Sequence, residues 1–144
     1  MSNFKKRMIT EIISGLWIGN ITDVYNENFY KDNIITIAIN CTLDQSFLDL
    51  PNLKKIRIPL SINLDPQTDM VLLTSKMDQI LQFIHENIEE NNIFIFCYNG
   101  LSISPLIIAN YMIKYGGISK DDIRDIIRSK NENVCLDFDL SMFT

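Results

Sequence analysis

The sequence predicts an α/β fold in which a central, mostly parallel sheet is flanked by helices. One sign is Ile34–Ile39, a nearly continuous β-branched run of the kind that fills interior strands of parallel sheets. Another is Val71–Glu90, where apolar residues recur at helical spacing with polar residues between them. Strand-like and helix-like segments also alternate along the chain, and this order favours a parallel sheet covered by helices.

The predicted strands are short apolar runs bounded by Gly, Pro or Asn. They are Gly15–Asn20, Ile34–Ile39, Lys55–Leu60 and Ile93–Phe96. Pro59 closes the third strand, because proline cannot donate to a sheet ladder. The segment that follows, Ser61–Asp69, is predicted to be a loop, with a turn at Asp65-Pro66.

The predicted helices differ in length and in the residues that end them. They are a short helix over Ile21–Tyr30, a long one over Val71–Glu90, and three more from Ser102 to Gly116, Lys120 to Lys130 and Phe138 to Phe143. Gly117 is a typical helix stop after the third. Ser119 is the expected N-cap of the fourth, with Asp121 and Asp122 favourably placed in its first turn.

Composition indicates one globular domain over residues 1–144. The chain is 47% hydrophobic and 22% charged, which is enough to bury a core without disulfides or metals. Its net charge of −5 argues against nucleic acid or an acidic membrane as the main partner. The three cysteines, Cys41, Cys97 and Cys135, have neither disulfide-framework nor metal-ligand spacing. With no membrane-length apolar run and no secretory signal, the expected location is the cytoplasm.

One stretch carries the functional information, Phe94–Pro105, which ends a strand, passes through a loop and opens a helix. Cys97 lies at the strand end and faces a helix N-terminus, where converging N–H groups and the helix dipole favour an anion. Gly100 stands where the loop needs an unusual backbone angle. Such a loop can hold a thiolate or a phosphate. The alternative is a buried structural cysteine in an ordinary strand-loop-helix unit.

Beyond the loop, a series of motifs lies in a consistent order. It comprises Gly15–Asn20, the strand ending in Asn40, Ile56–Pro59, Phe83–Glu86, and Cys97-x-x-Gly100-x-Ser102-x-Ser104-Pro105. In this order the chain resembles the dual-specificity protein phosphatases, of the small type found in cells and in large DNA viruses. The resemblance runs from about Ile13 to Phe143. It implies the cysteine-phosphatase fold, no cofactor or metal, and a viral origin as one expectation, with the host cytoplasm as the location in that case.

The family resemblance assigns roles to the retained residues of the loop. Cys97 takes the place of the nucleophile that attacks phosphorus, and Ser104 takes the place of the hydroxyl that assists the thiolate. The phosphate-binding loop corresponds to Tyr98, Asn99, Gly100, Leu101 and Ser102.

Three catalytic positions have become apolar. Ile103 replaces the Arg that clamps the phosphoryl oxygens, Phe96 replaces the His that supports the thiolate, and Ile62 replaces the general-acid Asp. Loss of a general acid alone lowers the rate roughly a hundred- to ten-thousandfold. The expectation is therefore a catalytically inactive homologue, a pseudophosphatase. Asp65 is an alternative acid if the loop is shifted, and Arg124, Arg128 and Lys114 are the alternative cations.

Two functions follow from these residues. The first is a non-catalytic protein-binding role, with a phosphoprotein, a kinase or an active phosphatase as partner. The second is a residual cysteine-dependent phosphatase that uses Cys97 and an unrecognised acid. A redox role for Cys97, with Cys41 as a disulfide partner, is a further hypothesis. The acidic end of the long helix, Glu86–Glu90, is expected to be solvated, with binding of a basic motif as its alternative.

Overall fold

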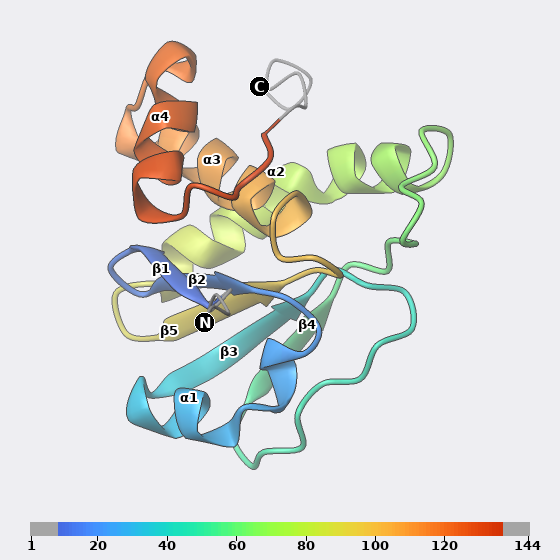
Figure 1. Ribbon diagram of the computed structural model, residues 1–144, viewed down its shortest axis with the longest axis vertical. Coiled ribbons are helices and arrows are strands. Elements are labelled where there is room, and N and C mark those ends of the chain that lie inside the picture. Colours follow the sequence, from blue (N-terminus) through green and yellow to red (C-terminus); the bar gives the residue numbers. More distant parts are fainter. Residues whose placement is uncertain (1–8, 137–144) are drawn as a thin grey trace, which may run out of the picture.

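A five-stranded sheet with helices on both faces forms the centre of the computed structural model, which describes residues 9–136 (Figure 1). The strands are β1 (Thr10–Ile13), β2 (Leu16–Gly19), β3 (Ile35–Asn40), β4 (Lys54–Arg57) and β5 (Asn92–Phe96). The helices are the 3-10 turn η1 (Asp23–Tyr25), α1 (Glu27–Asp32), α2 (Asp69–Asn87), α3 (Ile103–Gly116) and α4 (Lys120–Lys130). None of these helices is long and apolar enough to span a membrane.

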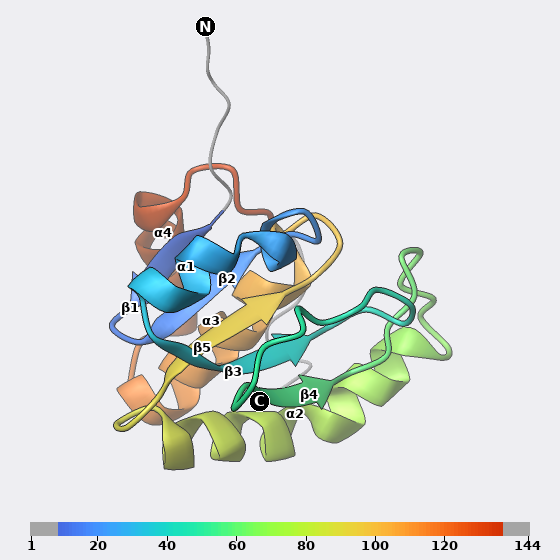
Figure 2. The same cartoon turned by 90° about the horizontal axis from the view of Figure 1, so that it is seen from below.

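The strand order in the sheet is β1-β2-β5-β3-β4, so β5 lies in the middle and β4 at one edge. Among the described strands, only the β1–β2 hairpin is antiparallel, and the remaining neighbours are parallel. The predicted α/β fold with a mostly parallel sheet is therefore confirmed. Figures 1 and 2 show that α2, α3 and α4 cover one face of the sheet, whereas α1 covers the other.

Each face of the sheet has its own core, and β5 contributes to both. Ile93, Ile95 and Cys97 pack on the side of α2, α3 and α4. Phe94 and Phe96 pack on the other side, in an aromatic cluster that also contains Val24, Phe29, Tyr30, Ile35 and Ala38. This alternation follows from the two-residue period of a strand. Because both faces are covered, β5 is an apolar strand that ends inside the protein.

Most element boundaries agree with the sequence prediction. Gly117 ends α3 in the left-handed conformation, with φ of 69°. Ser119 caps α4, and its hydroxyl oxygen accepts a hydrogen bond from the Asp121 N–H at 3.0 Å. Trp17 is a packing residue, and its ring lies edge-on to Phe29 at 5.2 Å between centroids.

Three local predictions were wrong or incomplete. The segment Ile21–Tyr30 is not one helix, because Asn26 leaves the helical conformation and its side chain caps α1 through the Phe29 N–H at 3.2 Å. The strand predicted to reach Leu60 ends at Arg57, before Pro59. Strand β1 was not predicted; it is a short edge strand whose only partner is β2.

The predicted short helix over Phe138–Phe143 lies outside the described residues.

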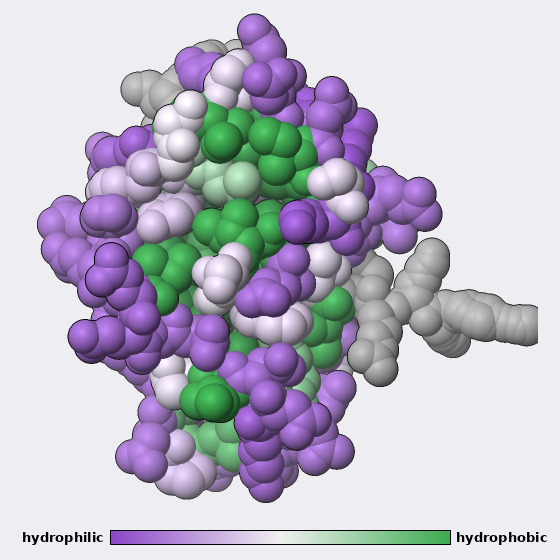
Figure 3. Space-filling view, turned by 90° about the vertical axis from the view of Figure 1, so that its left-hand side faces the viewer, coloured by the Kyte–Doolittle hydropathy of each residue, from purple (hydrophilic) through white to green (hydrophobic). Residues whose placement is uncertain are grey.

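Figure 3 views the molecule from the side that bears α1, the β1–β2 hairpin and α4. Apolar groups form several patches there, separated by hydrophilic side chains, so this side offers no continuous apolar surface among the described residues.

A close backbone contact fixes the loop after β5. Gly100 has φ of 72°, and a β-carbon there would lie 2.7 Å from the Gly19 carbonyl carbon and 3.0 Å from the Asn20 nitrogen. The Cys97 N–H also donates to the Gly19 oxygen at 3.3 Å. The loop therefore rests directly on the end of β2, and only glycine fits at residue 100.

A carboxylate holds the segment between β4 and α2. Asp69 is nearly buried at the start of α2 and accepts hydrogen bonds from the Ser61 N–H at 3.0 Å, the Asp65 N–H at 2.8 Å and the Ser61 hydroxyl. The Ser61 hydroxyl bond is the largest cause that lowers the pKa of Asp69 below its usual value. Asp69 thus fixes the loop that carries Ile62.

Substitution of Gly100 by Ala is expected to lower the free energy of unfolding by about 2 kcal/mol or more, because a left-handed alanine is strained and meets backbone. Gly117→Ala is the matched control, since Gly117 has a similar φ of 69° but a β-carbon added there would have no atom within 4 Å. Its cost is about 1 kcal/mol. Thermal unfolding of both variants measures the difference, and equal losses would contradict a backbone contact at Gly100.

Replacement of Asp69 by Asn is expected to lower the melting temperature at neutral pH, because the amide cannot accept the same three hydrogen bonds. The folded-state pKa of Asp69 is lowered, so its stabilising contribution is present above the unfolded pKa and is lost as pH falls. The difference between wild type and Asp69→Asn should therefore shrink between about pH 5 and pH 2. Asp65→Asn, which keeps the acceptor for the Gln67 N–H, is the control. A pH-independent difference would contradict this role.

Candidate functional site

Cys97 follows β5 directly and opens onto a cavity of about 270 Å³ at the carboxyl end of the sheet. Residues of four segments line this cavity, namely Ile21, Cys41, Ser61, Ile62, Leu64, Cys97, Tyr98, Asn99, Ser102 and Ile103. Carboxyl ends of parallel strands are the usual place for a ligand in an open α/β sheet. The structure therefore brings Cys97, Ile62 and Ile103 together around one cavity.

The Cys97 sulfur contacts the first turn of α3. Its Sγ lies 3.2 Å from the Ser104 hydroxyl oxygen, and the Ser104 N–H donates to it at 3.4 Å. Cys97 is almost fully buried, with 2% of its surface exposed. Its sulfur thus lies at the N-terminus of α3, beside one backbone N–H and one hydroxyl.

Asn99 fills part of the loop with its own side chain. Its Oδ1 accepts hydrogen bonds from the Leu101 N–H at 2.9 Å and from the Ser102 hydroxyl at 3.3 Å. The Cys97 thiol donates to the same oxygen at 3.8 Å. An anion in the loop would use such donors, so the carboxamide oxygen of Asn99 competes with it. The sequence placed Asn99 in the loop but gave no sign of this contact.

The apolar side chains at the two ends of the loop, Phe96 and Ile103, pack on different faces of the sheet. Ile103 begins α3, is 2% exposed, lines the cavity and belongs to the core beneath the helices. Phe96 lies on the opposite face of the sheet, where it stacks on Phe94 at 5.4 Å and contacts the Phe47 ring edge-on at 6.1 Å. Both side chains are therefore integral to a core.

The loop before α2 brings an apolar residue to the cavity. Ile62 lines it and is 67% exposed. Asp65, the alternative acid, is exposed and accepts a hydrogen bond from the Gln67 N–H at 2.9 Å, and it does not line the cavity. The Asp69 carboxylate accepts its hydrogen bonds from Ser61 and Asp65. The carboxylates of Asp65 and Asp69 therefore form hydrogen bonds that hold the loop structure.

The alternative cations also lie elsewhere. Arg124 donates from Nε to the Leu136 oxygen at 2.6 Å, and Arg128 donates from Nε to the Val134 oxygen at 3.1 Å. Lys114 pairs with Asp78 at 3.4 Å. Among the described residues that line the cavity, none carries a cationic side chain. A phosphate in the cavity would therefore lack a positively charged partner.

Cys41 and Cys97 line the same cavity, and both are free thiols. Complete burial, with a smaller contribution from the neighbouring Cys97, raises the pKa of Cys41 well above its usual value. Cys41 is therefore an unreactive thiol in this state.

One contact at the cavity mouth could not be predicted from the sequence. The Tyr98 hydroxyl donates to Asp44 Oδ1 at 2.5 Å, and the two residues are 54 positions apart. Partial burial and then this hydrogen bond raise the pKa of Tyr98, while the same bond is the main cause that lowers the pKa of Asp44. This hydrogen bond joins the loop after β5 to the segment after β3.

Other polar residues have no place in the site. His85 is exposed on α2, and its ring stacks on Tyr115 at 4.1 Å. Within residues 9–136, no group of three His, Cys, Asp or Glu side chains is arranged to hold a metal ion.

Comparison with known proteins agrees with this arrangement. The family model "Dual specificity phosphatase, catalytic domain" matches residues 16–142. The curated protein "Dual specificity protein phosphatase 1B" of Arabidopsis thaliana is 26% identical over 125 residues, which are 85% of this chain and 71% of that protein.

Solved structures share the fold at low sequence identity. Human DUSP28 superposes with a TM-score of 0.80 at 15% identity, over 94% of this chain and 89% of that one. The human tyrosine phosphatase-like serine/threonine/tyrosine-interacting protein superposes with a TM-score of 0.78 at 13% identity, over 96% and 92% of the two chains. The fold, the position of Cys97 and the match over most of the sequence place the chain in the dual-specificity phosphatase family.

Proposed function

We propose that this chain is a catalytically inactive member of its family, a pseudophosphatase that acts by binding another protein. The observation that carries the proposal is the cavity beside Cys97, whose described lining contains no cation and in which Ile103 is buried at the position of the family's Arg.

Physical chemistry makes this cavity a poor phosphate site. A phosphate that enters it loses hydration, and burial of an unpaired charge is strongly unfavourable. The missing guanidinium would have donated charge-assisted hydrogen bonds worth about 1.5–3 kcal/mol each. Asn99 Oδ1 already accepts from the Leu101 N–H and the Ser102 hydroxyl, so these donors are not free for an anion.

Leaving-group protonation is also unsupported. Ile62 has no proton to give, and Asp65 and Asp69 accept backbone hydrogen bonds away from the cavity or within their own loop. Together with the missing cation, this predicts a rate roughly ten thousandfold below that of an active enzyme, although effects within one catalytic unit do not add simply.

Protein binding is the remaining use of a preserved fold. The sheet, both cores and the backbone contact at Gly100 are intact although the catalytic groups are not. One similar structure carries the name of a phosphatase-like interacting protein, which supports binding as a use of this fold. The proposed partners are a phosphoprotein, a kinase or an active phosphatase.

A residual cysteine phosphatase is the second candidate. It is favoured by the Cys97 sulfur at the N-terminus of α3, with the Ser104 N–H at 3.4 Å and the Ser104 hydroxyl at 3.2 Å. A cysteine at a helix N-terminus is a usual position for a reactive thiol, and this position does not depend on the missing Arg.

A steady-state assay with an aryl phosphate separates the two candidates. Because cation and acid are both missing, wild-type turnover is expected to equal that of Cys97→Ser, which has no thiol. Turnover that exceeds the Cys97→Ser background would overturn the pseudophosphatase proposal in favour of the residual enzyme.

Restoration of the missing groups tests why the chain is inactive. The triple variant Phe96→His, Ile103→Arg, Ile62→Asp is expected to gain measurable turnover, and Asn99→Ala added to it should increase the rate by freeing the loop donors. Because Phe96 and Ile103 are buried, circular dichroism must first establish that the variant is folded. The same triple variant with Cys97→Ser is the control. A folded, inactive triple variant would mean that loop geometry, rather than the absent side chains, prevents catalysis.

A further inference from the structure

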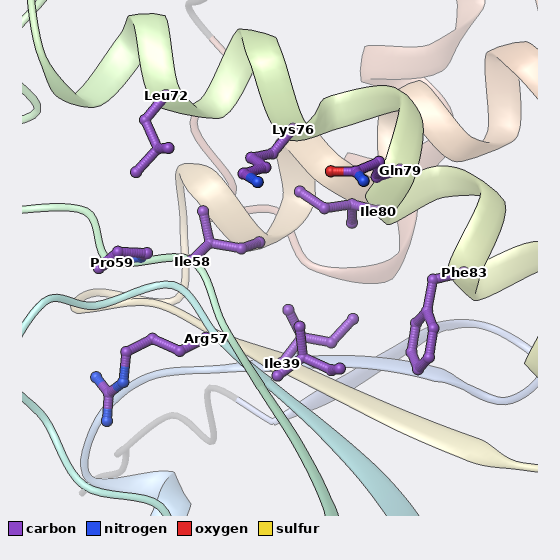
Figure 4. A pocket seen from close by; sticks show the side chains of 10 residues that line it. Ile39, Arg57, Ile58, Pro59, Leu72, Lys76, Gln79, Ile80 and Phe83 are labelled. Atoms are coloured by element: carbon purple, nitrogen blue, oxygen red, sulfur yellow. The ribbon is translucent and has the colours of Figure 1, made fainter.

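A second cavity, of about 340 Å³, lies between β4 and α2 and shares no lining residue with the Cys97 cavity (Figure 4). Its walls are mainly apolar. Figure 4 shows Leu72, Ile80 and Phe83 descending from α2 toward Ile58 and Ile39 on the strand side. The cavity is thus a gap between a helix and the edge of the sheet.

Within the part of the chain that the structure describes, strand β4 leaves one edge of its backbone unpaired. Its only partner among the described strands is β3, and the Ile58 N–H just beyond it donates to the Asn40 oxygen at 2.8 Å. Since backbone groups alternate sides along a strand, the N–H and C=O groups of Lys55 and Arg57 point away from β3. Within residues 9–136, no turn or loop forms a backbone hydrogen bond with these two residues. This edge can accept another strand.

Basic residues cluster on β4 and on the part of α2 that faces it, although the chain as a whole is acidic. Between Lys31 and Lys114 the only Lys and Arg residues of the sequence are Lys54, Lys55, Arg57 and Lys76. Lys76 lines the cavity, and Lys54 Nζ lies 5.1 Å from the centre of the Phe83 ring. Within the described residues, neither Lys55 nor Lys76 forms an ion pair. The surface is therefore complementary to negative charge.

We propose that this surface, the β4 groove, binds an extended acidic segment of a partner protein. The β4 groove is defined as the free edge of β4, the cavity with Lys54 and Lys76 on the α2 side, and Lys55, whose side chain lies on the opposite face of the same edge because strand residues alternate. The segment adds a strand to β4 and places an apolar side chain between β4 and α2, while acidic side chains meet the lysines. The inference rests on the proposed function in one respect, that the chain works by binding proteins.

Each part of the groove selects one property of the segment. Outward backbone groups at Lys55 and Arg57 select an extended main chain, as in other cases of strand addition. The apolar cavity favours apolar side chains at every second position of the segment, because alternate residues of a strand point to the same side. Unpaired lysines select carboxylates, and they disfavour a basic segment by like-charge repulsion.

Fluorescence anisotropy of a labelled peptide tests the proposal. The probe is an acetylated Glu-Glu-Leu-Glu-Leu-Glu-Glu peptide, and the same sequence with Lys in place of Glu is the reference. Saturable binding of the acidic probe to the full chain is expected, and it should weaken with salt. Lys55→Glu should weaken it roughly three- to tenfold. Lys130→Glu, the same charge change on α4, should leave it unchanged.

A second pair of variants tests strand addition itself. Lys55→Pro and Lys55→Ala remove the same charge, but only proline removes the outward N–H. The β3–β4 ladder does not use this N–H, so proline is compatible with the edge strand. Lys55→Pro is expected to bind the probe roughly three- to tenfold more weakly than Lys55→Ala. If Lys55→Pro is unfolded by circular dichroism, the Lys55→Glu and Lys130→Glu pair decides.

Specific results overturn the inference. They are the absence of saturable binding of the acidic probe, equal weakening by Lys55→Glu and Lys130→Glu, or tighter binding of the basic reference. A dimer in sedimentation that dissociates in Lys55→Glu, without probe binding, would assign the groove to a second copy instead. If the probe does not bind and wild-type turnover equals that of Cys97→Ser, only the β4 groove proposal is overturned. If the probe binds but wild-type turnover exceeds that of Cys97→Ser, only the pseudophosphatase proposal is overturned.

Discussion

The contact between Gly100 and the end of β2 is the constraint on which the site depends. Strand β5 is paired on both edges and covered on both faces, so it delivers Cys97 to a fixed point inside the protein. From there the chain must turn over the backbone of Gly19 and Asn20 before α3 can begin. This passage sets the Cys97 sulfur against Ser104 in the first turn of α3. Sheet and helix packing hold the two ends of the loop, and the Tyr98–Asp44 hydrogen bond holds it from outside.

A cavity lining without a cation and an intact fold are therefore compatible. Ile103 and Phe96 each add apolar area to one of the two cores. Burial of an Arg and a His in these places demands a phosphate or hydrogen-bonding partners to balance them, whereas isoleucine and phenylalanine need none. Asn99 and the Tyr98–Asp44 bridge further satisfy the polar groups of the loop from within the chain. The result is a stable loop whose donors are partly satisfied internally and whose cavity is apolar.

Much of this arrangement could be predicted because it depends on local patterns. The interior strand at Ile35–Asn40, the Ser119 cap and the glycine stop at Gly117 each follow from neighbouring residues. Contacts between distant segments could not be predicted, as for Tyr98 with Asp44 and for the groove between β4 and α2. Strand β1 has too short a pattern to identify without its partner β2, and Asn26 interrupts a helical pattern by a cap that only the folded chain reveals. The roles of Cys97, Ile103 and Ile62 were inferred from the order of the family's motifs, and the structure adds that the three residues line one cavity.

The most direct measurement of the central claim is an NMR titration of the wild-type chain with orthovanadate, an analogue of phosphate, followed through the backbone amides of residues 98–104. An apolar cavity without a cation predicts no saturable shift of these amides at millimolar vanadate, and a saturable shift in folded Ile103→Arg. Saturable shifts of the loop amides in the wild-type chain at micromolar vanadate would contradict the account, because the loop would then bind a phosphate-like anion without the clamp.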